Sequence, residues 1–208
     1  MMQRQEHGFT LLELLVAMTI TAILLSTIYG VFSSVSRAKE RVESGGEGYH
    51  QARVLFDRIG RELRGAYVLS GRPKTRLAGG LNEEQLPFLE LSTTATTPFG
   101  GHRGGIAIVR YDLRADPEAE RNQEGVIPRV LMRREYNLFD PEGEQRPGYR
   151  LATGLGEMTF RFYKDGDWRE EWLSGRDGSP QMVEVTLSIS VDGQPVPFRS
   201  TFEVPIIQ

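Results

Sequence analysis

The sequence predicts an α+β protein in which one long N-terminal helix precedes a sheet of antiparallel strands. Almost all of the long apolar sequence lies before residue 36, and the polar remainder carries most of the 23 glycines and all 11 prolines. Apolar residues then recur at helical steps of three and four as far as Ala66, and at alternate positions in several later segments. One helix followed only by strands is the pattern of an α+β domain.

The first element is an apolar segment that follows a short polar stretch, residues 1–8. Between Phe9 and Ser36 the one charged residue is Glu13. The uncharged stretch from Leu14 to Phe32 would be about 28 Å long as a helix, which is close to the hydrocarbon thickness of a bilayer. We therefore expect a membrane-spanning helix over residues 9–36.

Three interpretations of this segment compete. A secretory signal needs a basic start, a shorter apolar core and a small-x-small cleavage site. Here Arg4 is the one basic residue before the core, and no Ala-x-Ala follows Phe32. A plain membrane anchor accounts for the length of the segment. The third interpretation also accounts for the residues at its start.

Residues 8–13 read GFTLLE, and this string resembles the processing motif of type IV prepilins and type II secretion pseudopilins. The resemblance implies that residues 1–8 are a leader, that prepilin peptidase cuts between Gly8 and Phe9, and that Phe9 is then N-methylated. Glycine suits the cleavage site because it lacks a Cβ and permits close approach of a protease. The resemblance also places Glu13 where the family has a glutamate that pairs with the N-terminal amine of a neighbouring subunit.

Glu13 is a charged residue within a segment that is expected to span the membrane. A carboxylate near the centre of a spanning helix costs roughly 2.5–3.5 kcal/mol, so such residues are functional candidates. Glu13 would lie only about 6 Å along the helix from the mature N-terminus, where it can reach the interface and favour the positive end of the helix dipole. Both roles are compatible, and we expect Glu13 to act in inter-subunit assembly.

Charge does not favour a cytoplasmic N-terminus, because Arg37, Lys39 and Arg41 follow the apolar segment and only Arg4 precedes it. The resemblance to prepilins implies a single-pass protein of the bacterial inner membrane with its C-terminal part in the periplasm.

Residues 37–66 are expected to continue as an amphipathic helix, with a break at the three glycines of residues 45–48. An apolar stripe on this helix predicts packing on a core; it consists of Tyr49, Ala52, Phe56, Ile59, Leu63 and Ala66. The charged residues of the other face are expected to be solvated or to contact sister subunits; they are Arg53, Asp57, Arg58, Arg61, Glu62 and Arg64.

Residues 67–208 are expected to form a β-rich head. The segment Met182–Ile189 alternates apolar and polar residues, as a half-buried strand does. Strands are expected at residues 67–69, 88–93, 106–113, 129–138, 158–164, 182–191 and 198–204. Turn-rich segments at 100–105, 115–125, 139–148 and 173–180 separate them.

The composition limits the chemistry of the chain. It has no cysteine, which excludes disulfides and thiolate sites, and its net charge of −3 without a basic stripe speaks against nucleic acid. The glycine-rich residues 100–105 lack the Lys-Ser/Thr of a phosphate loop. His7, His50 and His102 match no metal or nucleophile spacing. We predict no catalytic residue, cofactor or metal site, and therefore not an enzyme.

Two acidic groups are weighed as cation ligands. Asp165, Asp167 and Glu170 resemble half of a calcium loop but lack its terminal glutamate, so an adventitious or structural calcium stays open. The second group is expected to be a solvated acidic loop; it consists of Asp112, Asp116, Glu118 and Glu120.

The C-terminal region resembles the minor pseudopilin J of the type II secretion system. A strand at residues 158–163 precedes a glycine turn, then Trp168 and Trp172, and Pro180 precedes the long strand. The helix pattern of residues 53–64 is similar as well. The resemblance implies a pilin-like fold and a place beside minor pseudopilins I, K and H at the tip of a periplasmic pseudopilus, which primes assembly of the major pseudopilin G and supports export of cargo proteins across the outer membrane.

Alternatives remain at this point. The two tryptophans are expected in the core or on a sheet face, although one could anchor a sister subunit. The N-terminal motif alone also fits a minor pilin of a type IV pilus or competence filament. A periplasmic enzyme on a membrane tether would need a catalytic constellation that the sequence does not offer.

Overall fold

The computed structural model describes residues 10–69, 74–96, 105–116, 118, 128–140, 142–191 and 194–205, with the backbone alone for 40–45 and 190. The predicted cleavage site at Gly8 and Phe9 lies outside these residues, as do His7, His102 and residues 100–104. Two compact units, Met1–Gly46 and Glu47–Gln208, are described separately.

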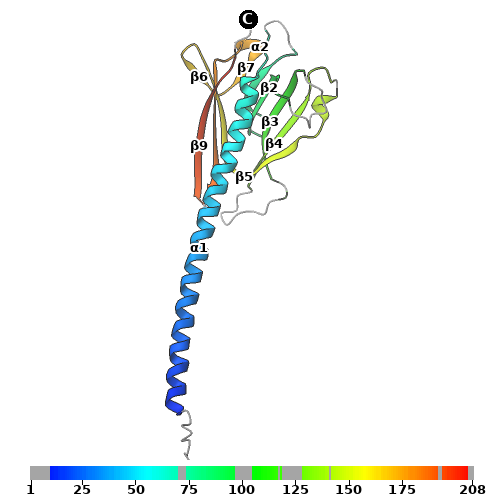
Figure 1. Cartoon of the computed structure of the whole chain (residues 1–208). Helices are drawn as coiled ribbons and strands as arrows, with labels where there is room; N and C mark the ends of the chain where they lie inside the picture. The colour runs from blue at the N-terminus through cyan, green and yellow to red at the C-terminus, as the bar shows by residue number, and fades with distance from the viewer. Residues whose placement is uncertain are drawn as a thin grey trace, which may run out of the picture. The chain divides into compact units, whose positions relative to one another are not determined.

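Helix α1 runs from Leu11 to Arg64 (Figure 1). In the first unit, the 29 residues from Leu11 to Lys39 are long and apolar enough to cross a bilayer. Four hydroxyls of this segment bond to carbonyl oxygens one turn back at 2.8–2.9 Å, which satisfies them without water; the donors are Thr19, Thr21, Thr27 and Ser34.

The helix break expected at residues 45–48 does not occur, since helical backbone continues through all three glycines. A glycine inside a helix costs about 1 kcal/mol relative to alanine, which long flanking helical segments outweigh. Gly48 instead allows close packing within the second unit, because a Cβ there would lie 2.6 Å from a Val191 methyl carbon. Gly60 does the same, with the Phe202 ring 2.4 Å from its would-be Cβ.

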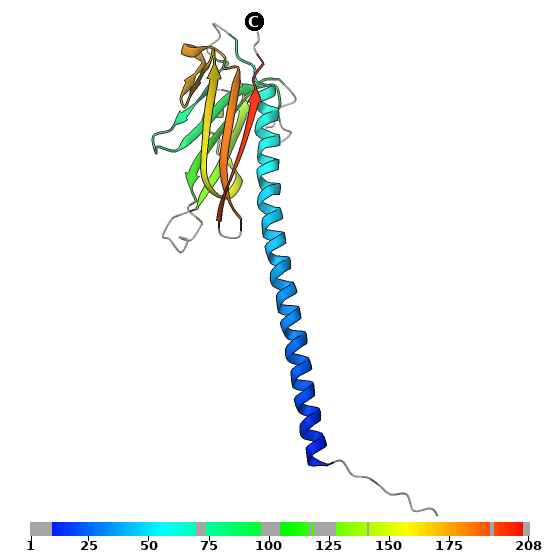
Figure 2. The ribbon, with the colours of Figure 1, turned by 90° about the vertical axis from the view of Figure 1, so that its left-hand side faces the viewer.

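The second unit holds a nine-stranded sheet in which every pair is antiparallel, ordered β7-β1-β2-β3-β4-β5-β8-β9 with β6 paired to β5. Figure 2 shows the sheet curving beside the C-terminal part of α1. The predicted α+β, pilin-like architecture is confirmed. The strands are β1 Leu77–Leu81, β2 Pro87–Thr93, β3 Ala107–Ala115, β4 Arg129–Asn137, β5 Tyr149–Lys164, β6 Asp167–Arg169, β7 Trp172–Leu173, β8 Met182–Val191 and β9 Gln194–Glu203.

Five predicted strands correspond to β2, β3, β4, β8 and β9, and a sixth to the second half of β5. The strand expected at residues 67–69 is wrong, since only the neighbouring Ala66 forms an isolated bridge, to Thr93. The sequence did not predict β1, in which two glycines stand, or the very short β6 and β7. Two expected turns hold short helices, η2 (Gly143–Gln145) and α2 (Ser174–Asp177).

The core lies between α1 and one face of the sheet. Of the predicted helix stripe, Ala52, Ile59, Leu63 and Ala66 are buried, and Phe56 packs against them half-buried. Tyr49 is 60% exposed instead, and its ring lies edge-to-face with that of Phe198, with 5.2 Å between the two ring centroids. The helix therefore presents its apolar stripe to the sheet as the periodicity predicts.

Candidate functional site

The described part of the N-terminal motif forms a hydrogen-bonded cap at the start of α1. Thr10 immediately precedes the helix, and the Glu13 backbone N–H donates to Thr10 Oγ1 at 3.2 Å. In return the Thr10 backbone N–H donates to Glu13 Oε2 at 3.1 Å, and the Thr10 hydroxyl donates to the same oxygen at 3.2 Å. This reciprocal arrangement is a capping box.

The box fixes the Glu13 carboxylate at the positive end of α1. It satisfies backbone N–H groups that have no partner inside the helix, and the helix dipole favours a negative charge there. Sequence reasoning placed Glu13 near this end but did not identify the box. Thr10-x-x-Glu13 before an apolar run is the signal that would have found it.

In the head, Glu62 does not lie on a solvated helix face as expected. It is 2% exposed, and its Oε1 lies 2.6 Å from Nη2 of Arg133 on β4, which is fully buried. The Tyr111 hydroxyl of β3 donates to the second oxygen of Glu62. Burial raises the pKa of Glu62, while Arg133 and Tyr111 oppose that rise. The pair joins the helix to the sheet.

The acidic loop expected around Asp112 and Asp116 is also wrong, because both side chains are buried and paired. Asp112 lies within β3 and accepts a hydrogen bond from Arg110 Nη2 at 2.8 Å. Asp116 and the exposed Glu118 both pair with Arg150. Glu120 lies outside the described residues.

Asp165 and Asp167 belong to a tight hairpin between β5 and β6. Asp165 and Gly166 both have positive φ, 52° and 99°, the conformation that Asp-Gly adopts in a two-residue hairpin loop. Across the part of the chain that the structure describes, no three His, Asp or Glu side chains are placed to hold a metal ion. The resemblance to half a calcium loop is explained by turn chemistry.

The two tryptophans differ in their surroundings. Trp172 is 2% exposed, stacks on Phe162 with centroids 6.0 Å apart, and donates from Nε1 to the Gly178 carbonyl at 3.0 Å. It is a core residue. Trp168 is half-buried against Tyr163, with the Arg161 guanidinium 5.2 Å from its ring centroid.

Comparisons with known proteins support both resemblances. The family model described as Type II secretion system (T2SS), protein J matches residues 30–196, and the Prokaryotic N-terminal methylation motif matches residues 3–29. The chain is 25% identical over 200 residues to the Type II secretion system protein J of Vibrio cholerae serotype O1, covering 90% of this chain and 83% of that protein.

The apolar helix and these matches are consistent with a single-pass inner-membrane protein, and membership implies interaction with other pseudopilins of the system. The match over residues 30–196 favours a secretion pseudopilin over the alternative of a pilus or competence minor pilin. The chain therefore belongs to the protein J family of the type II secretion system, and it is a minor pseudopilin of that system.

Proposed function

We propose that this minor pseudopilin works in the tip complex of the periplasmic pseudopilus. There it associates with minor pseudopilins I, K and H, primes assembly of the major pseudopilin G, and supports export of cargo proteins across the outer membrane. The observation that carries the proposal is the match to protein J over most of the head, together with a membrane-length apolar helix that begins at Leu11, within the motif.

Processing precedes assembly in this proposal. Prepilin peptidase cuts between Gly8 and Phe9 and methylates Phe9, which both fall within the matched methylation motif at residues 3–29. The new amine then lies one residue before the Thr10 cap. Residues after 36 are in the periplasm, where the head meets the other subunits.

Glu13 has two partners in turn. In the isolated subunit its carboxylate accepts two hydrogen bonds from Thr10, which reduce but do not cancel the cost of a charge in lipid. In the filament the amine of Phe9 on a neighbouring subunit replaces or joins Thr10, and this charged pair is stronger because the surroundings have a low dielectric constant. Helices gain no hydrophobic energy by leaving lipid for one another, so packing and this pairing must favour the exchange.

Two measurements test the proposal. Mass spectrometry of the protein purified from its own membrane should find a chain that begins at methylated Phe9, and Gly8→Val should leave the leader in place. A mature chain beginning at Met1 or Met2 would contradict the processing step.

Assembly is tested by complementing a strain that lacks the protein and measuring secretion and co-purification with pseudopilins I and K. Glu13→Gln should lower both, whereas Glu47→Gln, which removes an exposed carboxylate from the same helix, should not. Equal function of the two variants would reduce Glu13 to a helix cap.

A further inference from the structure

The face of the sheet that points away from α1 carries polar side chains, several of which are buried beneath arginines. Strand alternation places Arg110 and Asp112 opposite the core face of β3, and Glu90 lies directly across from Arg110 on β2. Glu90, Asp112 and Tyr136 are buried on this face, where arginine side chains lie over them. Most of its charges therefore already have partners.

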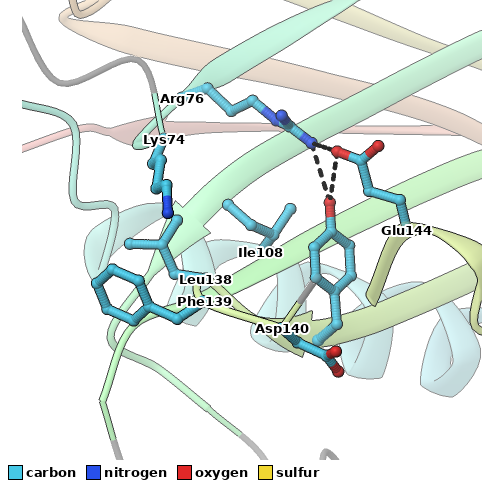
Figure 3. A pocket seen from close by; sticks show the side chains of 8 residues that line it. Lys74, Arg76, Ile108, Leu138, Phe139, Asp140 and Glu144 are labelled. Atoms are coloured by element: carbon cyan, nitrogen blue, oxygen red, sulfur yellow. Dashed lines mark hydrogen bonds and ion pairs between the residues drawn. The ribbon is translucent and has the colours of Figure 1, made fainter. Parts of the chain in front are cut away.

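A pocket of about 350 Å³ opens at one end of this face, beside the ends of β3 and β4 and the η2 turn (Figure 3). That volume falls within the range of about 300–1,000 Å³ usual for ligand sites. Ile108, Leu138 and Phe139 supply apolar walls. Phe139 is 71% exposed, so its ring is open to a partner.

The polar side of the pocket is internally satisfied. Arg76 Nη2 donates to Glu144 Oε1 at 2.6 Å and to the Tyr136 hydroxyl at 2.9 Å, and Arg76 also pairs with Glu90. Burial raises the pKa of Tyr136 to about 12, so its hydroxyl stays neutral. These groups form a fixed wall and leave no charge for a ligand.

Lys74 is different. Its Nζ lies 5.3 Å from the centroid of the Phe139 ring, and it forms no ion pair among the residues that the structure describes. The nearby Asp140 of the pocket is held by Arg146, with 2.8 Å between Oδ2 and Nη2. In Figure 3, Lys74 lies at the left with Leu138 and Phe139, whereas the side chain of Arg76 extends to the right toward Glu144.

We propose that this pocket binds a partner polypeptide through an acidic side chain that neighbours an apolar residue. The carboxylate meets Lys74, and the apolar residue lies against Ile108, Leu138 and Phe139. One unmatched cation suits a single negative charge. A nucleic acid backbone carries a row of negative charges, and Lys74 is the one lining cation without an ion pair among the described residues, so it would match only one of them.

A polypeptide fits better than a small anion because three apolar side chains line the pocket beside the polar ones, and one of them, Phe139, is an exposed aromatic ring. Aromatic residues are enriched in protein interfaces, where a few anchors supply most of the binding energy. The site is separate from Glu13 and goes beyond the proposed assembly role, so each can fail without the other.

The test selects short random peptides on the full-length mature protein in lipid nanodiscs, with the double variant Lys74→Gln/Phe139→Ala as the counter-selection. Peptides enriched on the wild type should carry Asp or Glu beside an apolar residue. Replacing that acid by its amide should weaken binding about tenfold, as expected for a charge-assisted hydrogen bond. Lys74→Gln should have the same effect.

Controls separate the charge from the fold. Arg199→Gln removes one exposed positive charge from β9, a strand that contributes no residue to the pocket lining, and should bind the peptides as the wild type does. Lys74→Arg should keep most of the binding. No enrichment over the double variant, peptides without a carboxylate, or competition by inorganic phosphate or acetate as effective as the unlabelled peptide would overturn the proposal.

Discussion

Glu62 of α1 and Arg133 of β4 form a buried ion pair, with 2.6 Å between Oε1 and Nη2. Both side chains are buried, so water does not solvate either charge. Each charge is therefore stabilised mainly by its oppositely charged neighbours. Arg133 Nη2 also lies 2.8 Å from Glu135 Oε2, which gives the guanidinium a second acidic neighbour. The pair joins the C-terminal part of α1 to strand β4.

Replacing one member of this pair should destabilise the head strongly. Glu62→Leu leaves a buried guanidinium with one carboxylate fewer, and we expect a loss of about 3 kcal/mol in the free energy of unfolding, at the lower end for broken buried pairs because Glu135 remains. Denaturant unfolding of the full-length protein in detergent, followed by tryptophan fluorescence, measures this.

The triple variant Glu62→Leu/Arg133→Met/Glu135→Gln should recover part of that loss, because it leaves no buried carboxylate that has lost Arg133 as its partner. The exposed Asp57→Ala on the same helix should change the free energy of unfolding by no more than about 0.5 kcal/mol. Similar losses for Glu62→Leu and Asp57→Ala would mean that the ion pair is unimportant.

Stability should depend on Glu144 at acid pH. The hydrogen bond from Arg76 holds the pKa of Glu144 below its ordinary value of 4.5. A lowered folded-state pKa means that this stabilisation is fully present above the unfolded pKa and is lost as pH falls through the folded pKa. Thermal unfolding at a series of acid pH values should therefore show a smaller fall in Tm for Glu144→Gln than for wild type.

The effect of Glu144→Gln should be small, because this side chain is largely exposed and solvent screens it. Glu142→Gln, at a nearby exposed position without an ion pair among the described residues, is the matched control and should follow the wild type. Identical acid profiles for all three proteins would count against the Arg76–Glu144 contact.

The capping box makes a prediction at the helix start. Thr10→Val removes the oxygen that accepts from the Glu13 N–H, and loss of such a cap costs about 1 kcal/mol. Hydrogen exchange of the Glu13 amide, measured by NMR in micelles, should then become about fivefold faster. Thr10→Ser keeps the hydroxyl and should keep most of the protection. Equal exchange in Thr10→Val and wild type would exclude the box.

Two glycines of α1 should respond in opposite directions to the same substitution. Gly60→Ala places a methyl group against the Phe202 ring, so overpacking should cost about 1–3 kcal/mol of stability. Gly46→Ala meets no described atom within 4 Å and should gain up to about 1 kcal/mol from helix propensity. Circular dichroism during thermal unfolding distinguishes the two signs, and stabilisation by both would show that α1 has room at Gly60.

The sequence predicted those features that repeat along the chain. Steps of three and four located the face of α1 that holds Ile59 and Leu63, and strict alternation located β8. Strand β1 was missed because Gly79 and Gly80 give it no alternation, although Gly79 is needed where the Phe162 ring passes within 2.4 Å of its would-be Cβ.

The charged residues of the head were harder to place than the apolar ones. Glu62 stands among arginines on its helix and reads as a solvated residue, and its partner Arg133 lies 71 positions further along the chain. Local pattern carries no information about such a pair. Asp112 was misplaced for a different reason. Its partner Arg110 is only two positions away, but the sequence alone does not show that both side chains lie on the covered face of β3.

The cap at the start of α1 also bears on the maturation of the subunit. Both residues of the capping box, Thr10 and Glu13, lie on the C-terminal side of the proposed cleavage site. Removal of the leader would therefore break no hydrogen bond of this box. The new N-terminal amine would lie next to a helix whose first turn is already capped. Proteolysis and insertion into the filament can then follow one another without an unwinding step between them.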